Sequence, residues 1–581
     1  MGDKGGSRAR MLWGGAIVFS LLLIVFSLFF LYLAESGPIR SEDELITSWP
    51  ESIFYEIYVP AFYDRDGDGL GDLEGVRRKL DDLKALGVEA LWLMPIYPSP
   101  SAHGYDVTDY TSVRPEYGTV EDVKRLSDAA HARGMHLILD FVANHTSIDH
   151  PWFQKALAGD PYYRDFYIWA DVQTNLSERG EWGQTLWYPA PTVHAGTVDE
   201  VGKVDEVGKT EGKSVEKDAL QQNAERVRSD AQENDQQLPL QEDEEGVRYY
   251  LATFDRSMPD LNYDNPHVRE AIIEAAKFWL TEADVDGFRL DAAKHIYPKS
   301  RLLDNVRWWA SFRTTLEKTK ADVFLVGEIW DTPGVIAPFY QALDATFDFD
   351  LSERLLKVVQ TETEGGLVSY LARVRGAYAK VNPDFIDAIF LSNHDTPRVM
   401  TVLDGDINHA KMAASLLLTL PGAPFLYYGE EIGMLGPKPD PRIREPIRWG
   451  GEEDVHSPIA LPRLANRDGP VYDEVERDPM GLYRHYRTMI YLRRSLDALV
   501  HGDMAVAHVR APGLVAFYRR DKDEHLLVLH NVGQAALDLS LDGENRSFTL
   551  VYGTHVDNRL SEGGRTVHLA PYSTAILRAR P

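Results

Sequence analysis

The chain of 581 residues contains no cysteine. This absence excludes disulfide bonds, thiolate metal sites, a cysteine nucleophile and a lipid-modified N-terminal cysteine. Basic residues are also few: 61 Lys and Arg stand against 90 Asp and Glu, and the formal net charge is −29. Such an acidic surface argues against a nucleic acid or an anionic membrane face as the partner, and it suits a neutral or cationic one. With 44% hydrophobic and 26% charged residues, the chain is long enough for three or four folded domains.

Charged residues are missing from Met11 to Ala34, where Leu, Ile, Val and Phe dominate. About 20 apolar residues span a bilayer, and basic residues before the run with acidic residues after it place the N-terminus in the cytoplasm. We therefore predict a cytoplasmic stub and membrane anchor at 1–35 and a polar tether at 36–50. A cleaved signal peptide is the competing interpretation, and in both cases the bulk of the chain lies outside the cytoplasm.

Aromatic residues are missing between Pro189 and Arg248. Residues 196–247 hold 15 acidic and 6 basic residues, and the hexapeptide at 198–203 is repeated at 204–209. Because this composition buries too little apolar surface to order itself, we predict a disordered acidic insert. A tolerated expansion of a surface loop is the simpler role, and an acidic interaction segment is the alternative.

In the rest of the chain, strand-length apolar runs alternate with amphipathic helical patterns, eight times over about 440 residues. Near-continuous apolar strands between such helices predict a parallel sheet covered by helices, and eight units favour a closed (β/α)8 barrel. No glycine-rich phosphate loop follows the first strand, which weakens a nucleotide-binding interpretation. After about Ser495 six short strands, the last of them at 566–577, predict a separate antiparallel β-sandwich domain. The strands predicted for the barrel lie at 53–59, 88–94, 136–141, 286–290, 323–327, 345–350, 386–391 and 424–428, and its first helix at 72–86.

Polar clusters follow four of the predicted barrel strands, where the chemistry of such a barrel belongs. They are the segments 140–145, 287–295, 327–330 and 392–395. Arg289 projects to the same side of its strand as Asp291, two residues later, and its charge would keep Asp291 ionised. A pair of carboxylates in such a setting performs glycoside hydrolysis, one as the nucleophile and the other as the acid/base.

The four clusters, in this order, resemble the motifs of the α-amylase family of glycoside hydrolases, family 13, over about residues 50–580. The resemblance implies that Asp291 is the nucleophile, that Glu328 is the general acid/base, and that Asp395 stabilises the transition state by gripping sugar hydroxyls. It also implies net retention of configuration at the anomeric carbon. The residues that it implies to bind or orient the sugar at the cleavage point are His145, Arg289 and His394.

The resemblance also implies the domain organisation, because family members carry a small domain B after the third barrel strand. Residues 258–262 resemble a family motif in a form intermediate between oligo-1,6-glucosidases and neopullulanases. The expected parts are the barrel at 51–146 and 258–495, domain B at 147–257 and the β domain at 496–581.

An acidic loop at 64–72 places Asp at positions 1, 3, 5 and 9 of a glycine-rich turn. Hard oxygen ligands at alternate positions suit Ca²⁺, although position 12 is Gly75 and the loop is therefore not an EF-hand. A plain acidic turn is the alternative. Relatives similar to oligo-1,6-glucosidases bind Ca²⁺ at such a loop, and many amylases bind it at a second site. The ligands that this resemblance implies are Asp64, Asp66, Asp68, the Leu70 carbonyl and Asp72, with Asn144 at the second site.

The residues around the nucleophile favour α-1,4-glucans as the substrate. Ala292 occupies a place that is usually Ala or Thr in α-1,4-acting relatives and Val in α-1,6-acting ones, and Lys294 with His295 resembles the pair that lines the leaving-group side. We therefore predict an α-amylase that acts on starch-derived maltooligosaccharides, with transglycosylation as a side reaction. Residues that resemble those gripping the non-reducing glucose in exo-acting relatives are Tyr105, Asp106 and Arg444. Tyr105 is expected to be a stacking platform for a sugar, and a loop salt bridge is the alternative for Asp106 and Arg444.

Other activities would retain the same catalytic residues. They are those of an α-glucosidase, a cyclomaltodextrinase or an enzyme that converts maltose and trehalose. Outside enzymes, the heavy chains of heteromeric amino-acid transporters share an N-terminal span and an amylase-like ectodomain. Those chains tether their partner through a juxtamembrane cysteine, which is absent here, and we predict no obligate protein partner.

Overall fold

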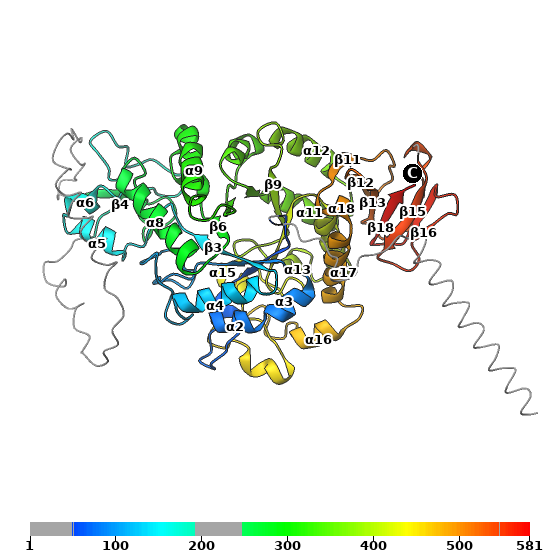
Figure 1. Cartoon of the computed structure of the whole chain (residues 1–581), viewed down its shortest axis with the longest axis horizontal. Helices are drawn as coiled ribbons and strands as arrows, with labels where there is room; N and C mark the ends of the chain where they lie inside the picture. The colour runs from blue at the N-terminus through cyan, green and yellow to red at the C-terminus, as the bar shows by residue number, and fades with distance from the viewer. Residues whose placement is uncertain (1–48, 50, 192–246, 545, 581) are drawn as a thin grey trace, which may run out of the picture. The chain divides into compact units, whose positions relative to one another are not determined.

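The computed structural model describes residues 49, 51–191, 247–544 and 546–580 (Figure 1). Eight parallel strands form a closed barrel in the order β1-β10-β9-β8-β7-β6-β3-β2, which confirms the predicted (β/α)8 barrel. The strands are β1 (Phe54–Ile57), β2 (Ala90–Leu93), β3 (His136–Phe141), β6 (Gly287–Leu290), β7 (Phe324–Gly327), β8 (Ala345–Phe347), β9 (Ile386–Phe390) and β10 (Ala423–Tyr427).

The chain divides into two compact units. The described residues of Met1–Leu93, Leu126–Leu137 and Trp330–Pro581 make up the first unit, and those of Met94–Arg125 and Ile138–Ile329 make up the second. In the first, β1 pairs in parallel with β2 and β10. In the second, β6 lies between β3 and β7. Every residue of β1 and β6 is buried, so a charged residue in these strands must find its partner inside the protein.

The first helix begins at the capping residue that the sequence supplies, but it has one interruption that the periodicity did not predict. Asp72 caps α2 by accepting from the backbone N–H of Gly75 at 2.7 Å. The predicted helix at 72–86 then breaks at Lys79, whose ammonium lies 4.2 Å from the centre of the Trp449 ring and 2.6 Å from Glu453. The helices of the barrel region are α2 (Leu73–Arg78), α3 (Leu80–Leu86), α4 (Val120–His131), α8 (Pro266–Glu282), α9 (Leu302–Leu316), α10 (Pro333–Ile336), α11 (Phe349–Thr361), α12 (Leu367–Tyr378), α13 (Val399–Val402), α14 (Ile407–Thr419), α15 (Asp440–Ile443), α16 (Tyr472–Arg477), α17 (Leu482–Ser495) and α18 (Asp497–Val500).

Within the second unit, the segment after β3 forms a small subdomain of its own. It contains helices α5 (Pro151–Leu157) and α6 (Pro161–Arg164) and a hairpin of β4 (Trp187–Pro189) with β5 (Tyr249–Leu251). In Figure 1 these helices and β4 lie together at the left, beyond α8. Asn265 then caps α8 by accepting from the backbone N–H of His267, and Pro266 begins the helix.

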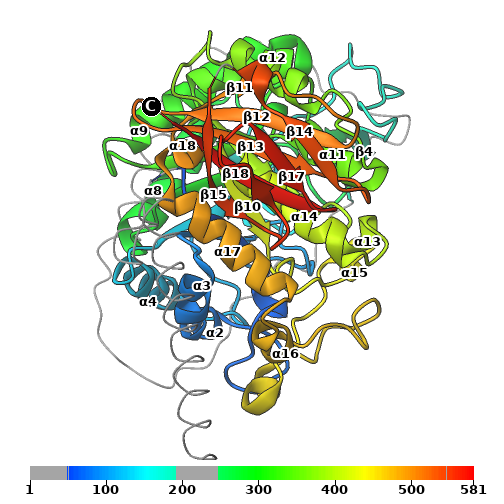
Figure 2. The same ribbon diagram turned by 90° about the vertical axis from the view of Figure 1, so that its right-hand side faces the viewer.

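The C-terminal β domain packs on the first unit's helices (Figure 2). Its two antiparallel sheets have the orders β11-β12-β13-β18-β15 and β14-β17-β16 and share one apolar core. Thr419 of α14 anchors the domain, because its hydroxyl pairs with His530 at 3.0 Å and its carbonyl accepts from Arg519 at 2.7 Å. The strands are β11 (Asp503–Val506), β12 (Leu514–Arg520), β13 (His525–Asn531), β14 (Leu537–Ser540), β15 (Phe548–Gly553), β16 (Arg559–Leu560), β17 (Thr566–Leu569) and β18 (Ser573–Ala579).

The prediction of an N-terminal transmembrane helix is wrong, and the prediction that the membrane is a partner of this chain falls with it. Among the described residues no helix is long and apolar enough to cross a bilayer. The longest of them, α8, has 17 residues and one polar face, whereas a span needs about 20 apolar ones. Residues 11–34, on which the prediction rested, lie outside the described residues, as do residues 196–246 of the predicted acidic insert.

Candidate active site

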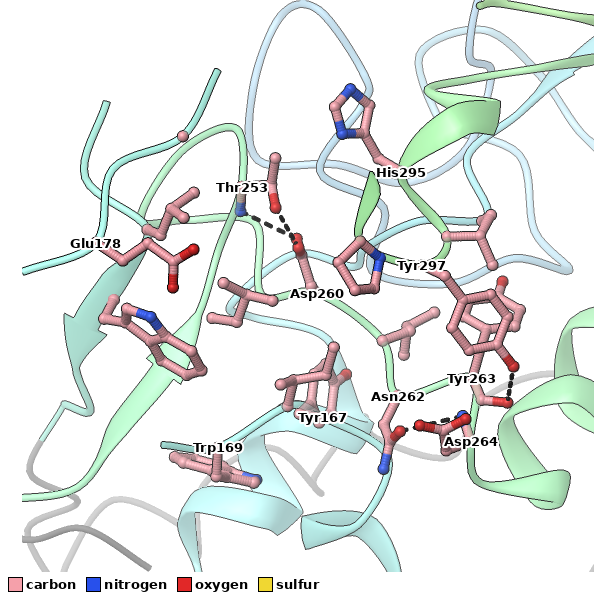
Figure 3. A pocket seen from close by; sticks show the side chains of 18 of the residues that line it. Tyr167, Trp169, Glu178, Thr253, Asp260, Asn262, Tyr263, Asp264, His295 and Tyr297 are labelled. Atoms are coloured by element: carbon pink, nitrogen blue, oxygen red, sulfur yellow. Dashed lines mark hydrogen bonds between the residues drawn. The ribbon is translucent and has the colours of Figure 1, made fainter. Parts of the chain in front are cut away.

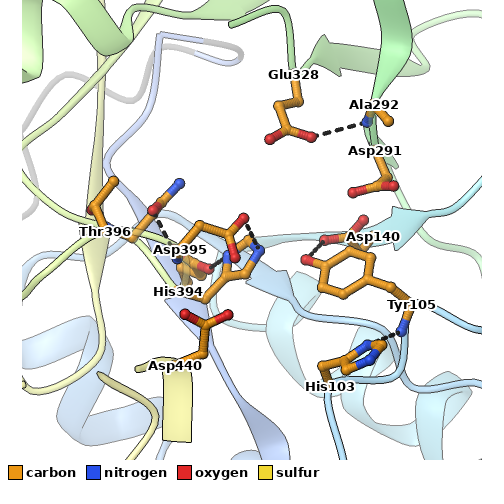
Figure 4. Close-up of polar contacts among 12 residues, drawn as sticks. His103, Tyr105, Asp140, Asp291, Ala292, Glu328, His394, Asp395, Thr396 and Asp440 are labelled. Atoms are coloured by element: carbon orange, nitrogen blue, oxygen red, sulfur yellow. Dashed lines mark hydrogen bonds and ion pairs between the residues drawn. The ribbon is translucent and has the colours of Figure 1, made fainter. Parts of the chain in front are cut away.

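A buried arginine organises the polar residues of the second unit, of which Figure 4 shows Tyr105, Asp140, Asp291 and Glu328. The Arg289 side chain, on β6, is only 1% exposed. Its Nη1 lies 2.7 Å from Asp291 and 2.8 Å from Asp140, and its Nη2 lies 3.0 Å from Glu328. A planar guanidinium with forked donors is suited to holding several carboxylates at once. The structure thus brings Asp291 and Glu328, predicted from separate motifs, to one cation.

The two predicted catalytic carboxyls are held by the ends of neighbouring strands. Asp291 follows β6, Glu328 follows β7, and their side chains are 11% and 16% exposed. Glu328 Oε2 accepts the backbone N–H of Ala292 at 2.9 Å, and Ala292 has a left-handed φ of 47°. The strained residue after Asp291 therefore turns its N–H toward Glu328.

Asp140 on β3 belongs to this network, although the sequence reasoning did not single it out. The Tyr105 hydroxyl donates to its Oδ2 at 3.0 Å, and its Oδ1 accepts from Arg289 at 2.8 Å. The Arg289 guanidinium also lies 5.6 Å from the centre of the Tyr105 ring. Tyr105, predicted as a sugar platform, is thereby fixed against the same arginine.

His145 lies at the end of the same cluster as a buried, neutral ring. Burial lowers the pKa of His145 to about 4. Its Nε2 has no hydrogen-bond partner among the described residues, and its ring centre lies 5.4 Å from that of Phe254. An unpartnered buried nitrogen is costly unless a ligand completes it, which is compatible with a sugar hydroxyl.

A second charged network lies in the first unit (Figure 4). His394 is fully buried, with Nδ1 2.5 Å from Glu56 on β1 and Nε2 3.0 Å from Asp395. Burial opposes a charge on this imidazole, but Asp395 and Glu56 outweigh it and raise the pKa of His394 to about 10. His394 is therefore an imidazolium at neutral pH, clamped between two acids. Glu56 was not predicted as a site residue.

Arg444 holds the other oxygen of Asp395. Its Nη2 lies 3.0 Å from Asp395 and 3.3 Å from Asp440, and its Nε donates to the carbonyl of His394 at 3.0 Å. Asp395 thus lies between two cations, which keeps its side chain, 33% exposed, in one orientation.

The remaining predicted substrate residues, in the second unit, are also engaged. Asp106 is buried and accepts hydrogen bonds from the hydroxyls of Ser99 and Ser101. Lys294 forms an ion pair of 2.8 Å with Glu181 of the subdomain after β3. His295 lies beside Phe254, with ring centres 5.2 Å apart.

Comparison with known proteins decides the family. The protein-family model "Alpha amylase, catalytic domain" matches residues 56–197 and 230–502. A second family model, "Alpha-amylase SusG C-terminal domain", matches residues 514–576. The chain belongs to the α-amylase family of glycoside hydrolases. It is therefore a glycosidase, as predicted. This result favours the enzyme over the alternative of an amino-acid transporter heavy chain.

Relatives of this α-amylase family member match it along most of their length. Alpha-amylase 3 of Dictyoglomus thermophilum is 38% identical, over 91% of this chain and 93% of that protein. The 4-alpha-glucanotransferase of Thermotoga neapolitana is 35% identical, over 68% and 76%. Among solved structures, the alpha-amylase from H. orenii is similar with a TM-score of 0.76 and 35% identity, over 91% of this chain and 99% of that one.

Enzymes of the α-amylase family commonly bind calcium, and the acidic loop after β1 offers a suitable set of oxygens. One carboxylate oxygen each of Asp64, Asp66 and Asp72 lie within 4.8 Å of one another. Burial raises the pKa of Asp72, with a further contribution from the two neighbouring acids. A hard cation would relieve this crowding, so the three residues fit Ca²⁺. Asp68 is not in this group, and its carboxylate accepts the N–H of Leu70 at 2.8 Å.

Asn144, the ligand predicted for a second calcium site, lies in a different environment. Asn144 donates its side-chain amide to Asp260 at 3.3 Å, and Thr253 donates two more hydrogen bonds to the same carboxyl. Burial raises the pKa of Asp260 to about 7. A metal role for Asn144 stays a prediction.

A cavity of about 1050 Å³ lies between the subdomain after β3 and the segment 295–301 (Figure 3). Neither Asp291 nor Glu328 lines it. Its lining residues include Tyr167, Trp169, Glu178, Asp260, His295 and Tyr297.

Proposed function

We propose that this chain is a retaining α-amylase that cleaves the α-1,4-glucosidic bonds of starch-derived maltooligosaccharides. The observation that carries the proposal is the contact of one buried guanidinium, that of Arg289, with both Asp291 and Glu328. Two carboxyls at neighbouring strand ends, held by one cation, suit a reaction that needs a nucleophile and a proton donor on opposite sides of one sugar carbon.

In the first step, an Asp291 oxygen attacks the anomeric carbon, and the bond from that carbon to the glycosidic oxygen breaks. Glu328 gives its proton to the departing oxygen, leaving a glycosyl ester on Asp291. Arg289 stabilises the carboxylate of Asp291 before the attack, and the N–H of Ala292 orients Glu328.

In the second step, Glu328 takes a proton from water, whose oxygen attacks the anomeric carbon and releases Asp291. Two inversions give net retention. We assign to Asp395 the role that its motif has in the family, gripping the hydroxyls of the reacting glucose. The imidazolium of His394 and the guanidinium of Arg444 hold that carboxylate for this task.

The bond specificity and the binding roles rest on the residues around the nucleophile. Ala292 supports α-1,4 linkages, Lys294 and His295 line the leaving-group side, and Tyr105 is a stacking platform for a sugar ring. Asp106 is the candidate for binding the non-reducing glucose.

Product analysis tests this proposal. Maltoheptaose should give a series of shorter maltooligosaccharides with the α-configuration at the new reducing end, as read by proton NMR, whereas maltose should be cleaved poorly. Glucose as the first product from both would indicate an α-glucosidase, and trehalose from maltose would indicate a converting enzyme. Products longer than maltoheptaose would indicate glucan transfer, the activity that names the Thermotoga neapolitana relative.

We further propose that Ca²⁺ binds the loop at 64–72 and fixes the turn between β1 and α2. Removal of the ion with a chelator should lower the melting temperature of the wild type, and added Ca²⁺ should restore it. Asp66→Ala should remove this response, while Asp557→Ala, an exposed acid elsewhere, should keep it. An unchanged response in Asp66→Ala would refute the assignment.

A further inference from the structure

An exposed tryptophan marks the tip of a tight hairpin in the subdomain after β3. The Trp182 side chain is 62% exposed, whereas large apolar side chains usually avoid water. Arg179 and Thr185 bridge the base of the hairpin, and Gly183, with a φ of 77°, makes the turn. The backbone of an ordered hairpin therefore holds Trp182 in its exposed position.

Two tethers hold this hairpin, one to the loop after barrel strand β6 and one to the loop after β5. Glu181 forms an ion pair of 2.8 Å with Lys294. Gln184 accepts the N–H of Trp182 at 3.0 Å and donates to the carbonyl of Thr253 at 3.1 Å. The residues on both sides of Trp182 are therefore fixed, and little conformational entropy remains to be lost when the ring binds a ligand.

The Trp182 ring extends a row of rings that begins at His145. Its centre lies 5.8 Å from that of Phe254 and 5.7 Å from that of His295. The Phe254 ring in turn lies 5.4 Å from His145, whose Nε2 has no partner among the described residues. The row therefore runs from His145, which the resemblance implies to bind the reacting sugar, to His295, which it implies to line the leaving-group side.

We propose that Trp182 is a stacking platform for a glucose unit on the leaving-group side of the cleaved bond. The apolar face of a pyranose ring packs well on an aromatic ring, and indole offers the largest such face among side chains. The same platform would hold an acceptor sugar in the second step and raise transfer relative to hydrolysis. This inference rests on the proposed function, because it needs a substrate with sugars on both sides of the bond.

The main test compares Trp182→Ala with the wild type on substrates of different length. The kcat/KM for maltoheptaose should fall about fivefold to tenfold, within the range of about twofold to twelvefold that one aromatic contact supplies. The kcat/KM for an aryl glucoside with a small leaving group should change less than twofold, and Trp182→Phe should recover most of the loss. Val172→Ala, in the same subdomain and 60% exposed, is the control and should match the wild type.

A binding measurement separates this inference from the proposed function. In Glu328→Gln, which cannot turn over substrate, maltoheptaose should quench tryptophan fluorescence, and Trp182→Phe in the same background should remove part of the quenching. If the wild type cleaves maltoheptaose but Trp182→Ala leaves kcat/KM and the quenching unchanged, the platform is refuted while the α-amylase stands. Equal losses on the long and short substrates would indicate a structural role and would also refute the platform. If the wild type cleaves no α-glucan, the proposed function fails first.

Discussion

Replacing Arg289 with lysine tests the central feature of the site, in which the two carboxyls proposed to be catalytic, Asp291 and Glu328, share one cation. Lysine retains the positive charge in this buried position, but it offers one ammonium instead of a fork that reaches Asp291 with one nitrogen and Glu328 with the other. The change therefore affects the geometry more than the charge balance.

The magnitude follows from the bonds that are lost. A hydrogen bond to a charged group contributes about 1.5–3 kcal/mol. Loss of good geometry to both Asp291 and Glu328 would cost about 3–6 kcal/mol, which at about 1.36 kcal/mol per tenfold is a decrease of about 10²–10⁴-fold in kcat. KM should change much less, because Asp395, which we propose to grip the sugar hydroxyls, is held by His394 and Arg444 and not by Arg289.

The assay is the steady-state rate on maltoheptaose, with circular dichroism to show that the variant is folded. Arg77→Lys is a matched control, because Arg77 also holds a carboxylate with two donors, at 2.6 and 2.7 Å, but its side chain is 39% exposed. An exposed pair contributes little, so this variant should stay within about twofold of the wild type. A folded Arg289→Lys enzyme that retains more than a tenth of the wild-type kcat would refute the reasoning.

Three further outcomes are expected. Asp291→Asn and Glu328→Gln should each retain less than about 1% of the hydrolysis of maltoheptaose while melting like the wild type, since each removes a group that the chemistry needs; substantial turnover would contradict the assignment. The raised pKa of His394, about 10, means that its charge stabilises the fold fully below about pH 6.5 and is lost as the pH rises through about 10. The free energy of unfolding should therefore fall toward pH 10, and less steeply in Glu56→Gln; equal slopes by urea titration would refute the clamp. Deleting 196–246 should leave activity on maltooligosaccharides nearly unchanged, because the β4–β5 hairpin already brings the flanking strands together; a large loss of kcat/KM would show that the insert shapes the cleft.

The barrel and the order of its catalytic motifs could be predicted because both leave local patterns in the sequence. Apolar runs of strand length mark the strands, and strand pleating alone predicts that Arg289 and Asp291 share a side, as their 2.7 Å contact shows. The limits of single elements were harder to predict. The predicted strand at 566–577 is two strands, β17 and β18, separated by a turn at Tyr572 with a φ of 47°.

The supporting residues could not be placed from the sequence, because their partners are far away along the chain. Glu56 and His394 are separated by 338 positions, and Asp140 and Arg289 by 149. A signal was nevertheless present. Glu56 and Asp140 are single acids inside runs predicted to be buried, and a buried charge is costly unless it is paired. An acid in such a run is therefore a candidate for a site even when no motif contains it.

The same pairing changes what the net charge of −29 says about the substrate. The six acids of the two networks face three cations, Arg289, Arg444 and the charged form of His394, so they contribute only about three charges to the excess. The stretch at 196–247 alone supplies a net −9 from its 15 acidic and 6 basic residues. The acidity of the chain therefore arises mainly away from the site, and the neutrality of the proposed substrate agrees with the site, where each of these acids contacts a cation.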